Sequence, residues 1–336
     1  MRILITGHTG FKGSWLAMML RELGHEIHGI SLNPLPNGIF EQASVMELCK
    51  SDLRIDIRNK EALDAAFEDT QPNFVFHLAA QPLVLKSYDE VYETYSTNVS
   101  GTLNVLDASQ KSKSLSGVIV VTTDKVYLNH EEQRAFVESD ALGGHDPYSS
   151  SKALADLLSQ DWSRHHPDIP IGIARAGNVI GGGDVSPNRL VPDLINAIQT
   201  SKIPSIRNPK AVRPWQHVMD CLNGYIALMD HVVEGNSGAF NFGPKNGDFH
   251  TVEEVTTHTL NFFNESEWAQ DSDKKGKESG FLTLDSTKSQ RVLDWENKLS
   301  FEQGLDWTLD WHKALFNGSN VKDFTISQIK NFFSLT

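Results

Sequence analysis

The residues with the clearest capacity for chemistry lie between positions 123 and 152. Thr123, Asp124 and Lys125 are consecutive, and Tyr148 and Lys152 lie four residues apart. A spacing of four places two side chains on the same face of a helix. An ammonium beside a phenol favours the phenolate and lowers a pKa that is ordinarily about 10. Tyr148 could then take a proton from a substrate hydroxyl while a hydride leaves the same carbon.

The three consecutive residues add further groups of the same kind. Thr123 could give a second hydrogen bond to the reacting oxygen, while Asp124 could act as an acid and Lys125 as a base. The alternative is an ordinary amphipathic helix, because Tyr-x-x-x-Lys alone is a common pattern. The elements around these residues have to decide between the two interpretations.

Those elements are predicted to be a buried strand and a helix. Residues 117–122 read Gly-Val-Ile-Val-Val-Thr, which is typical of a strand buried on both faces. Asp146 is a favourable N-cap and Pro147 suits the first position of a helix. The apolar positions that follow recur at helical spacing. Tyr148 would therefore lie in the first turn of the helix.

The N-terminus carries a second pattern, a strand, a glycine-rich turn and a helix. Residues 2–6 predict a short strand, and Gly7, Gly10 and Gly13 follow directly. In a dinucleotide-binding turn the first glycine permits the tight turn, the second lets the backbone approach the pyrophosphate, and the third lets helix pack on strand. The pyrophosphate would lie at the helix N-terminus, where free N–H groups favour an anion.

The end of the second predicted strand, residues 26–31, should contact the adenosine ribose. An acidic residue is expected there about 20 positions past the glycines, but the chain has Ser31, Leu32 and Asn33. No arginine occurs between Arg21 and Arg54, so no clamp for a 2′-phosphate is evident. The sequence favours NAD over NADP, with modest affinity.

Further strands are predicted at residues 53–57, 73–80, 170–174 and 240–244, the last returning to the first domain. The predicted fold class is α/β, a Rossmann-type doubly wound parallel sheet with a smaller, mixed α/β C-terminal substrate domain. The predicted NAD-binding domain comprises residues 1–177 and 219–243. The predicted substrate domain comprises residues 178–218 and 244–336. The polar stretch 274–280 is expected to be a mobile loop.

Composition limits the partners. A net charge of −13 over 336 residues argues against nucleic acid and an anionic membrane as partners. Cys49 and Cys221 form no CxxC pair, which fits a reducing compartment and no metal site. The first residues become glycine-rich too soon for a signal peptide, and no apolar run reaches membrane-spanning length. We expect a cytoplasmic protein.

Positive charge nevertheless gathers in the second part of the chain. Arg175, Arg189, Arg207, Lys210 and Arg213 lie close in sequence within an otherwise acidic protein. Arginines suit bidentate contacts with a diphosphate. The alternative is a set of scattered surface arginines.

These motifs together resemble the extended short-chain dehydrogenase/reductases that act on nucleotide sugars, over nearly the whole chain. The resemblance rests on the GxxGxxG spacing and on residues 7–15, 77–84, 174–184, 213–218 and 311–313. Related dehydratases resemble Thr-Asp-Glu at the catalytic strand end. Lys125 stands at the glutamate position here, and that substitution resembles the branch of the family that acts on CDP-glucose. The absence of an acidic residue at Asn33 departs from the family pattern.

The resemblance implies an internal redox dehydration that converts CDP-glucose to CDP-4-dehydro-6-deoxyglucose, in deoxysugar and O-antigen-type polysaccharide synthesis. NAD would be tightly retained. Tyr148 would take the 4-hydroxyl proton, Asp124 would protonate the departing 6-hydroxyl, and Lys125 would be the C5 base, with Thr123 and Lys152 completing the catalytic set. The alternatives are another nucleotide-sugar 4,6-dehydratase, a 4-epimerase on the same scaffold and, more remotely, a non-catalytic cofactor-sensing regulator.

The resemblance also assigns binding residues. The expected cofactor residues are Gly7, Thr9, Gly10, Phe11, Lys12, Gly13, Asn33, Asp56, Ile57, Leu78, Ala79, Ala80, Gln81, Thr97, Tyr148 and Lys152. The expected substrate residues are Pro82, Asn178, Arg189, Leu190, Arg207, Arg213 and Asn241. Helices after Thr97 and Tyr148 would form a homodimer interface, with a dimer of dimers as a variant. They could equally well only cover the sheet.

Overall fold

A seven-stranded sheet forms the centre of the molecule. The computed structural model describes residues 1–245, 248–271 and 280–335, so most of the stretch 274–280 lies outside the described residues. The strands are parallel and follow the order β11-β6-β5-β4-β1-β2-β3. Their bounds are β1 Arg2–Thr6, β2 Glu26–Ser31, β3 Cys49–Arg54, β4 Phe74–His77, β5 Val118–Val121, β6 Ile171–Ala176 and β11 Gly238–Phe242.

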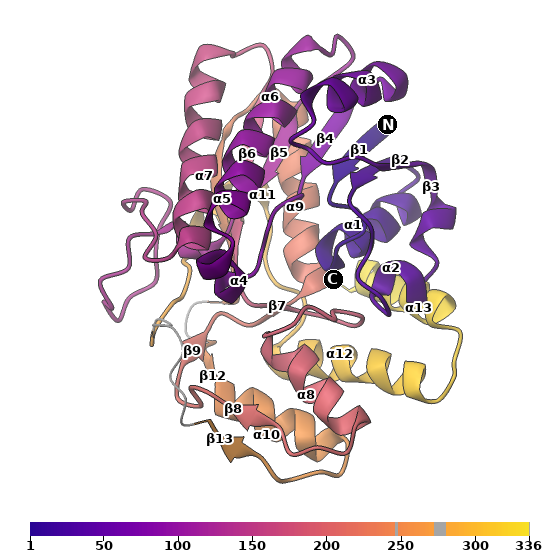
Figure 1. Ribbon diagram of the computed structural model, residues 1–336, viewed down its shortest axis with the longest axis vertical. Helices are drawn as coiled ribbons and strands as arrows, with labels where there is room; N and C mark the ends of the chain where they lie inside the picture. Colours follow the sequence, from indigo (N-terminus) through magenta and orange to yellow (C-terminus); the bar gives the residue numbers. More distant parts are fainter. Residues whose placement is uncertain (246–247, 272–279, 336) are drawn as a thin grey trace.

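Both faces of this sheet are covered by helices (Figure 1). Successive strand residues point to opposite faces, so Ile3 and Ile5 pack in one apolar core and Leu4 packs in the other. The first core lies under α1 and α9, and the second lies under α3, α6 and α7. The bounds of these helices are α1 Phe11–Glu22, α3 Lys60–Thr70, α6 Thr102–Lys111, α7 Pro147–His165 and α9 Val218–Val233.

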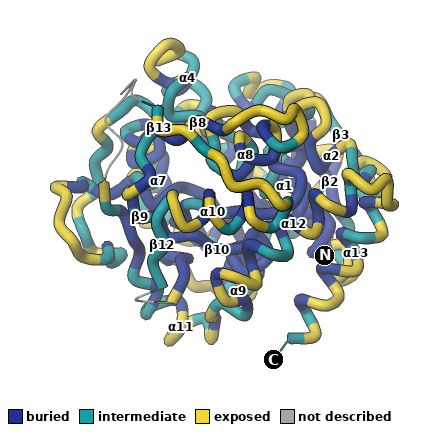
Figure 2. The backbone as a smooth tube through the Cα atoms, turned by 90° about the horizontal axis from the view of Figure 1, so that it is seen from below, coloured by how far each residue is buried: buried dark blue, intermediate teal, exposed yellow. Residues whose placement is uncertain are grey.

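Short elements surround the sheet's carboxyl edge and its outer strands. They are α2 Ile39–Gln42, η1 Val45–Leu48, α4 Val84–Asp89, α5 Val91–Tyr95, the π-helical turn η2 Ser96–Gly101 and η3 Asp124–Val126. The α4 segment stands out from the surface, with mostly intermediate or exposed residues (Figure 2). The buried residues follow the sheet and the helices that cover it.

A smaller layer lies below the carboxyl edge of the sheet in Figure 1. It contains α8 Leu190–Gln199, α10 Val252–Phe262 and α12 Phe301–Phe316, which share an apolar core of their own. Three two-stranded pairings complete it: β7 Val179–Ile180 with β10 Gln216–His217, β8 Ser205–Ile206 with β13 Ala269–Gln270, and β9 Val212–Arg213 with β12 His250–Thr251. Within the described residues, none of the helices combines the length and apolar character needed to cross a membrane.

The predicted doubly wound parallel sheet is confirmed. The third strand was misplaced, because it spans Cys49–Arg54 rather than residues 53–57. Its residues are only partly buried and include Lys50, Ser51 and Asp52, so an edge strand here lacks the apolar run that marks the inner strands. Two helices assigned to the substrate domain pack on the sheet domain: α11 Thr287–Leu293 contacts α9 and β11, and α13 Val321–Ser334 contacts α1.

Candidate active site

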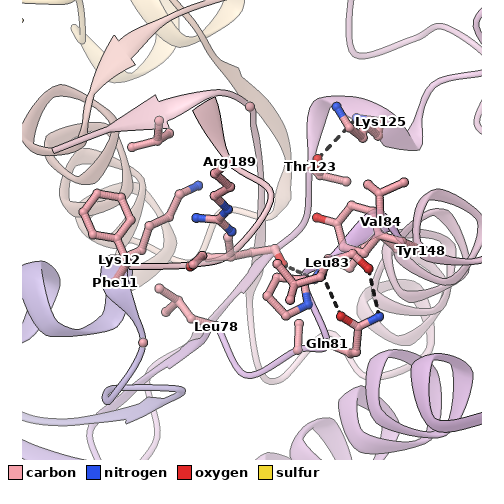
Figure 3. A pocket seen from close by; sticks show the side chains of 18 of the residues that line it. Phe11, Lys12, Leu78, Gln81, Leu83, Val84, Thr123, Lys125, Tyr148 and Arg189 are labelled. Atoms are coloured by element: carbon pink, nitrogen blue, oxygen red, sulfur yellow. Dashed lines mark hydrogen bonds between the residues drawn. The ribbon is translucent and has the colours of Figure 1, made fainter. Parts of the chain in front are cut away.

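A cavity of about 730 Å³ opens at the carboxyl ends of the sheet strands, between the sheet and the smaller layer. Open α/β sheets bind ligands at this edge, at the position where the strand order reverses. In this sheet the order reverses between β1 and β4. The loops that follow β1, β2, β4, β5 and β6 all contribute to the lining. Figure 3 shows Phe11 and Lys12 on one side, Tyr148 and Val84 on the other, and Arg189 between them.

The glycine-rich turn has the shape of a cradle for a dinucleotide. Gly7 has a φ of +80°, and a Cβ there would lie 2.7 Å from the backbone nitrogen of Ala79. A Cβ on Gly13 would overlap the Gly7 carbonyl oxygen. The first turn of α1 has no acidic residue, and no side chain caps its N-terminus. The backbone N–H groups there can face an anion, so the turn fits the pyrophosphate of NAD.

Most of the expected cofactor residues line this cavity. They are Gly7, Thr9, Gly10, Phe11, Lys12, Gly13, Asp56, Ile57, Leu78, Ala79, Ala80, Gln81, Thr97, Tyr148 and Lys152. Asn33 is not among them, because β2 ends at Ser31 and the chain turns outward, leaving Asn33 exposed. Ser31, Leu32 and Leu35 line the cavity there instead.

The part of the cavity that follows β3 carries two carboxylates, both of which contact one arginine. The Arg58 guanidinium contacts Asp56 Oδ2 at 2.5 Å and Glu93 Oε2 at 2.5 Å. The hydrogen bonds from Arg58 keep the pKa of Asp56 below its ordinary value. Glu93 was not predicted from sequence, since α5 comes next to Asp56 only through the fold.

The loop after β4 is shaped by a small network. Gln81 exchanges hydrogen bonds with the backbone of Leu83 at 2.7 and 3.2 Å (Figure 3). Asn98, buried in the π-helical turn, accepts a hydrogen bond from the Gln81 N–H at 2.8 Å and donates to Ser151 Oγ at 2.9 Å. Such a turn inside a helix often marks a functional site. Asn98 therefore ties the cavity loop to the helix that carries Tyr148, a role that nothing in the sequence indicated.

Thr123 and Asp124 form a compact pair at the end of β5. The Thr123 hydroxyl donates to Asp124 Oδ1 at 2.9 Å and accepts from the Lys125 N–H at 3.4 Å. Asp124 is only 1% exposed. Among the described residues, its Oδ2 has no hydrogen-bond partner. Both carboxylate oxygens lie against Gly177, which follows β6, and a side chain at that position would overlap them.

Tyr148 lies in the first turn of α7, as predicted. Asp146 caps the helix by accepting from the Ser149 N–H at 2.9 Å, and Pro147 takes the first position. Burial raises the pKa of Tyr148 to about 12, and the nearby charge of Asp124 adds to the rise. A hydrogen bond with Thr123 and the charge of Arg189 oppose it. The phenol thus lies between the strand-end pair and a cation.

Lys152 is buried one turn further along α7. Its Nζ donates to the Val121 carbonyl oxygen at 2.7 Å. Burial, helped by the charge of Lys12, lowers the pKa of Lys152 to about 8, and Asp156 opposes this. The lowering of the Tyr148 pKa expected from Lys152 is not the net result in this structure. The ammonium is directed to a backbone carbonyl, and burial of the phenol outweighs the charges around it.

The basic residues divide into two groups. Arg189, Arg207 and Arg213 line the cavity, as do Pro82, Asn178 and Leu190. Arg189 pairs with Asp184 at 2.9 Å, so part of its charge is already balanced. Lys210 is exposed and lies outside the lining.

Arg175 does not belong to the cavity. Its guanidinium pairs with both oxygens of Asp156 at 2.8 Å and donates to the Tyr127 hydroxyl at 2.9 Å. Arg175 and Asp156 are almost completely buried. The interpretation of Arg175 as a diphosphate ligand is wrong. Arg175 lies within β6, and its side chain faces α7, which carries Asp156.

Asn241 is also remote from the cavity lining. It is fully buried on β11, where its Oδ1 accepts from Tyr127 at 2.6 Å. Its Nδ2 donates to the backbone oxygens of Phe136 and Asp285 at 2.9 and 3.1 Å. These contacts join β11 to the loop before α7 and to the segment before α11. The structure does not bring Asn241 together with the other expected substrate residues.

Known proteins resemble this chain in sequence and in fold. Residues 3–243 match the model of the "NAD dependent epimerase/dehydratase family". CDP-glucose 4,6-dehydratase of Salmonella typhimurium is 36% identical over 100% of this chain and 97% of its own. Two crystal structures share the fold. UDP-glucuronic acid 4-epimerase from Bacillus cereus, in complex with UDP-glucuronic acid and NAD, has a TM-score of 0.82 at 23% identity, over 94% of this chain and 100% of its own. dTDP-glucose 4,6-dehydratase from Bacillus anthracis, in complex with NAD, has a TM-score of 0.79 at 24% identity, over 95% and 98%.

Proposed function

The chain belongs to the NAD dependent epimerase/dehydratase family, and on that premise we propose that it is an NAD-dependent hydro-lyase that converts CDP-glucose to CDP-4-dehydro-6-deoxyglucose. The observation that carries the proposal is the meeting of Thr123, Asp124 and Lys125 with Tyr148 and Lys152 in one cavity beside a dinucleotide cradle. The full-length similarity to a CDP-glucose 4,6-dehydratase supports the same substrate.

The glycine turn and the residues after β4 would hold NAD. When bound, NAD supplies a reversible acceptor for the hydrogen and electron pair of the sugar C4, which return at C6, so the reaction has no net oxidation. The protein residues supply binding, orientation and proton transfer. Lys152, which lines the cavity, would bind the nicotinamide ribose.

Tyr148 acts on the sugar 4-hydroxyl. In its phenolate form, which the charge of Arg189 and the hydrogen bond with Thr123 favour, Tyr148 takes the hydroxyl proton as the C4–O bond gains double-bond character. Thr123, which contacts both Asp124 and the phenol, supplies a second hydrogen bond to the same oxygen. The 4-keto group that results acidifies the C5–H bond, which prepares the elimination.

Asp124 and Lys125 act on the two atoms that lose water. Lys125, as the free amine, removes the C5 proton, and Asp124, in its protonated form, donates a proton through Oδ2 to the departing 6-hydroxyl, so one water leaves. Asp124 Oδ2 is suited to this because no described protein donor occupies it. After the C6 carbon is reduced, a proton returns to C5. Atoms and electrons balance, since the hydrogen removed from C4 is restored at C6.

The arginines at the other end of the cavity would bind the diphosphate. Arg189, Arg207 and Arg213 come from the smaller layer and face the cavity together. Guanidinium groups match phosphate oxygens in a bidentate geometry. A substrate held there would extend its hexose toward Tyr148, because Arg189 influences the pKa of that phenol.

A substrate comparison tests the proposal. Purified protein with added NAD is incubated separately with CDP-, dTDP-, UDP- and GDP-glucose, and each tube is assayed in alkali for the 4-keto chromophore. We expect the chromophore in the CDP-glucose tube alone. A chromophore with another nucleotide sugar would replace the substrate assignment, and CDP-galactose as product would indicate a 4-epimerase. No product from any sugar would contradict the proposal.

We further infer that the chain forms a homodimer through α6 and α7. These helices contact each other, and they expose Leu103, Leu154 and Leu157 by 40%, 44% and 46%. Leucines so exposed on neighbouring helices are typical of a covered interface. We assign the protein to the cytoplasm, which is supported by the free cysteines Cys49 and Cys221.

A further inference from the structure

Thr9 and Ser31 line the cavity where β2 ends, and Arg54 lies beside them, outside the lining. Thr9 Oγ1 contacts Ser31 Oγ at 2.7 Å and donates to the Leu32 carbonyl oxygen at 3.1 Å. Arg54 Nη1 contacts the same carbonyl oxygen at 3.5 Å. Thr9, Ser31 and Leu32 all line the cavity. A guanidinium therefore stands beside the position that the adenosine ribose takes in a dinucleotide-binding sheet.

Arg54 reaches this position through strand pairing. In the parallel register of β2 and β3, Ser31 lies opposite Arg54, so the last residues of the two strands are neighbours. The chain between them is 22 residues long and contains no arginine. Sequence spacing alone therefore gave no sign of a cation at the ribose.

The guanidinium is held in place but retains donors for a ligand. Arg54 Nη2 pairs with Asp52 Oδ2 at 2.7 Å, and the guanidinium lies 5.3 Å from the centre of the Phe40 ring. The Asp52 carboxylate is itself held by His8, whose Nε2 lies 2.7 Å from Asp52 Oδ1. In the strand register Asp52 lies opposite Gly29, two residues before the end of β2. Arginine has five donors in a fixed planar fork, and the ion pair uses one edge of it.

The charges at this end of the cavity also allow an added anion. Residues 31–38 contain no acidic side chain, and the Asp52 carboxylate that contacts Arg54 is balanced by that ion pair. The two carboxylates that line the part of the cavity after β3, Asp56 and Glu93, are both paired with Arg58. We propose that the dinucleotide site accepts NADP as well as NAD, and that Arg54 is the specificity-determining residue that binds the 2′-phosphate. This inference rests on the dinucleotide site of the proposed function.

Direct binding tests the inference without turnover. Kd values for NADPH and NADH are measured by fluorescence titration of cofactor-depleted protein, and thermal shifts are recorded with 2′,5′-ADP and 5′-ADP. We expect NADPH to bind within about tenfold of NADH. Arg54→Met should weaken NADPH binding by roughly 10- to 100-fold, the value of a charge-assisted contact, while NADH changes less than about twofold. The thermal shift with 2′,5′-ADP should fall in parallel.

A second variant and a control complete the test. Ser31→Asp places a carboxylate at the ribose and should also weaken the binding of NADPH more than that of NADH. This variant tests the inference if Arg54→Met does not fold. Arg164→Met removes an arginine that is 66% exposed on α7 and should change neither affinity. Wild-type binding of NADPH more than about 100-fold weaker than NADH, or equal loss of both dinucleotides in Arg54→Met, would overturn the inference. Dehydration of CDP-glucose with NAD would then still stand, whereas failure of both dinucleotides to bind would contradict the proposed function itself.

Discussion

The backbone of Gly177 lies so close to the Asp124 carboxylate that a methyl group at position 177 would overlap it. Asp124 follows β5 and Gly177 follows β6, and the two strands are neighbours in the sheet. The position of the proposed acid is therefore set by a glycine from another strand. Packed groups of this kind hold a carboxylate within the small tolerance that proton transfer demands.

Replacing Gly177 with alanine should move the acid without unfolding the protein. The Asp124 side chain would have to shift, because the new methyl group meets both of its oxygens. We expect kcat to fall by about 100-fold or more, since misplacement by about 1 Å costs that much. Gly143→Ala is the matched control, because a Cβ there makes an ordinary contact of 3.4 Å with Leu128. A Gly177→Ala enzyme with the wild-type rate would contradict the role of this contact.

Removing the proposed acid should slow elimination strongly. Asp124→Asn keeps the hydrogen bond from Thr123 but cannot donate a carboxylic proton, so we expect the rate of water loss to fall by roughly 100- to 10,000-fold. Mass spectrometry of the sugar nucleotide measures this loss, and Asp89→Asn on the exposed end of α4 serves as control. If Asp124→Asn eliminated water at a near wild-type rate, the acid would be another residue.

The buried pair of Arg175 and Asp156 should govern stability rather than substrate binding. Arg175→Met leaves the Asp156 charge without its partner, and we expect the free energy of unfolding to fall by about 3–5 kcal/mol. Urea denaturation measures the loss. The double variant Arg175→Met with Asp156→Leu removes both charges and should recover part of it. If Arg175→Met raised the KM for substrate and left the stability unchanged, Arg175 would instead be a substrate-binding residue.

Acid should destabilise the protein through its buried histidines. Burial lowers the pKa of His77 and His217 to about 3 and that of His312 to about 4. Below the ordinary value of 6.5 the unfolded chain binds protons at these sites that the folded chain does not, so stability falls as pH falls. Asp220, whose pKa burial raises to about 7, acts in the opposite direction, as do Glu138, Asp193, Asp230 and Asp310, whose pKa values burial also raises.

The contribution of one histidine can be isolated. His217→Asn keeps a side chain that can cap α9, where His217 Nδ1 now accepts from the Met219 N–H at 3.2 Å. Between about pH 4.5 and 6, we expect the slope of the unfolding free energy against pH to be smaller in the variant than in the wild type, by about 1.4 kcal/mol per pH unit. Equal slopes in the variant and the wild type would show that His217 does not titrate on unfolding.

The inferred dimer should separate when its apolar face is charged. Leu154→Glu combined with Leu157→Glu places like charges on both copies of α7, so we expect a monomer in sedimentation velocity at micromolar concentration. Leu23→Glu changes a leucine of similar exposure, 44%, at the end of α1, and should leave the assembly intact. A double variant that sediments like the wild type would place the interface elsewhere.

Local sequence determined the parts of this protein that depend on neighbouring residues. The strand and glycine turn at Gly7, the cap at Asp146 and the spacing of Tyr148 and Lys152 could be predicted, because helix geometry and backbone sterics act over a few positions. The same patterns predicted the parallel sheet and the strand end that carries Asp124. These features need no knowledge of distant segments.

Only the tertiary structure decided which distant residues meet the site. Strand register brings Arg54 to the end of β2, and helix packing brings Glu93 to Asp56. The packing of helices on the sheet also buries Arg175 and Asn241 in the core, although both lie within motifs that suggested binding. Register and burial depend on how the whole sheet packs between its helices, and spacing along the chain does not encode the outcome at any one side chain.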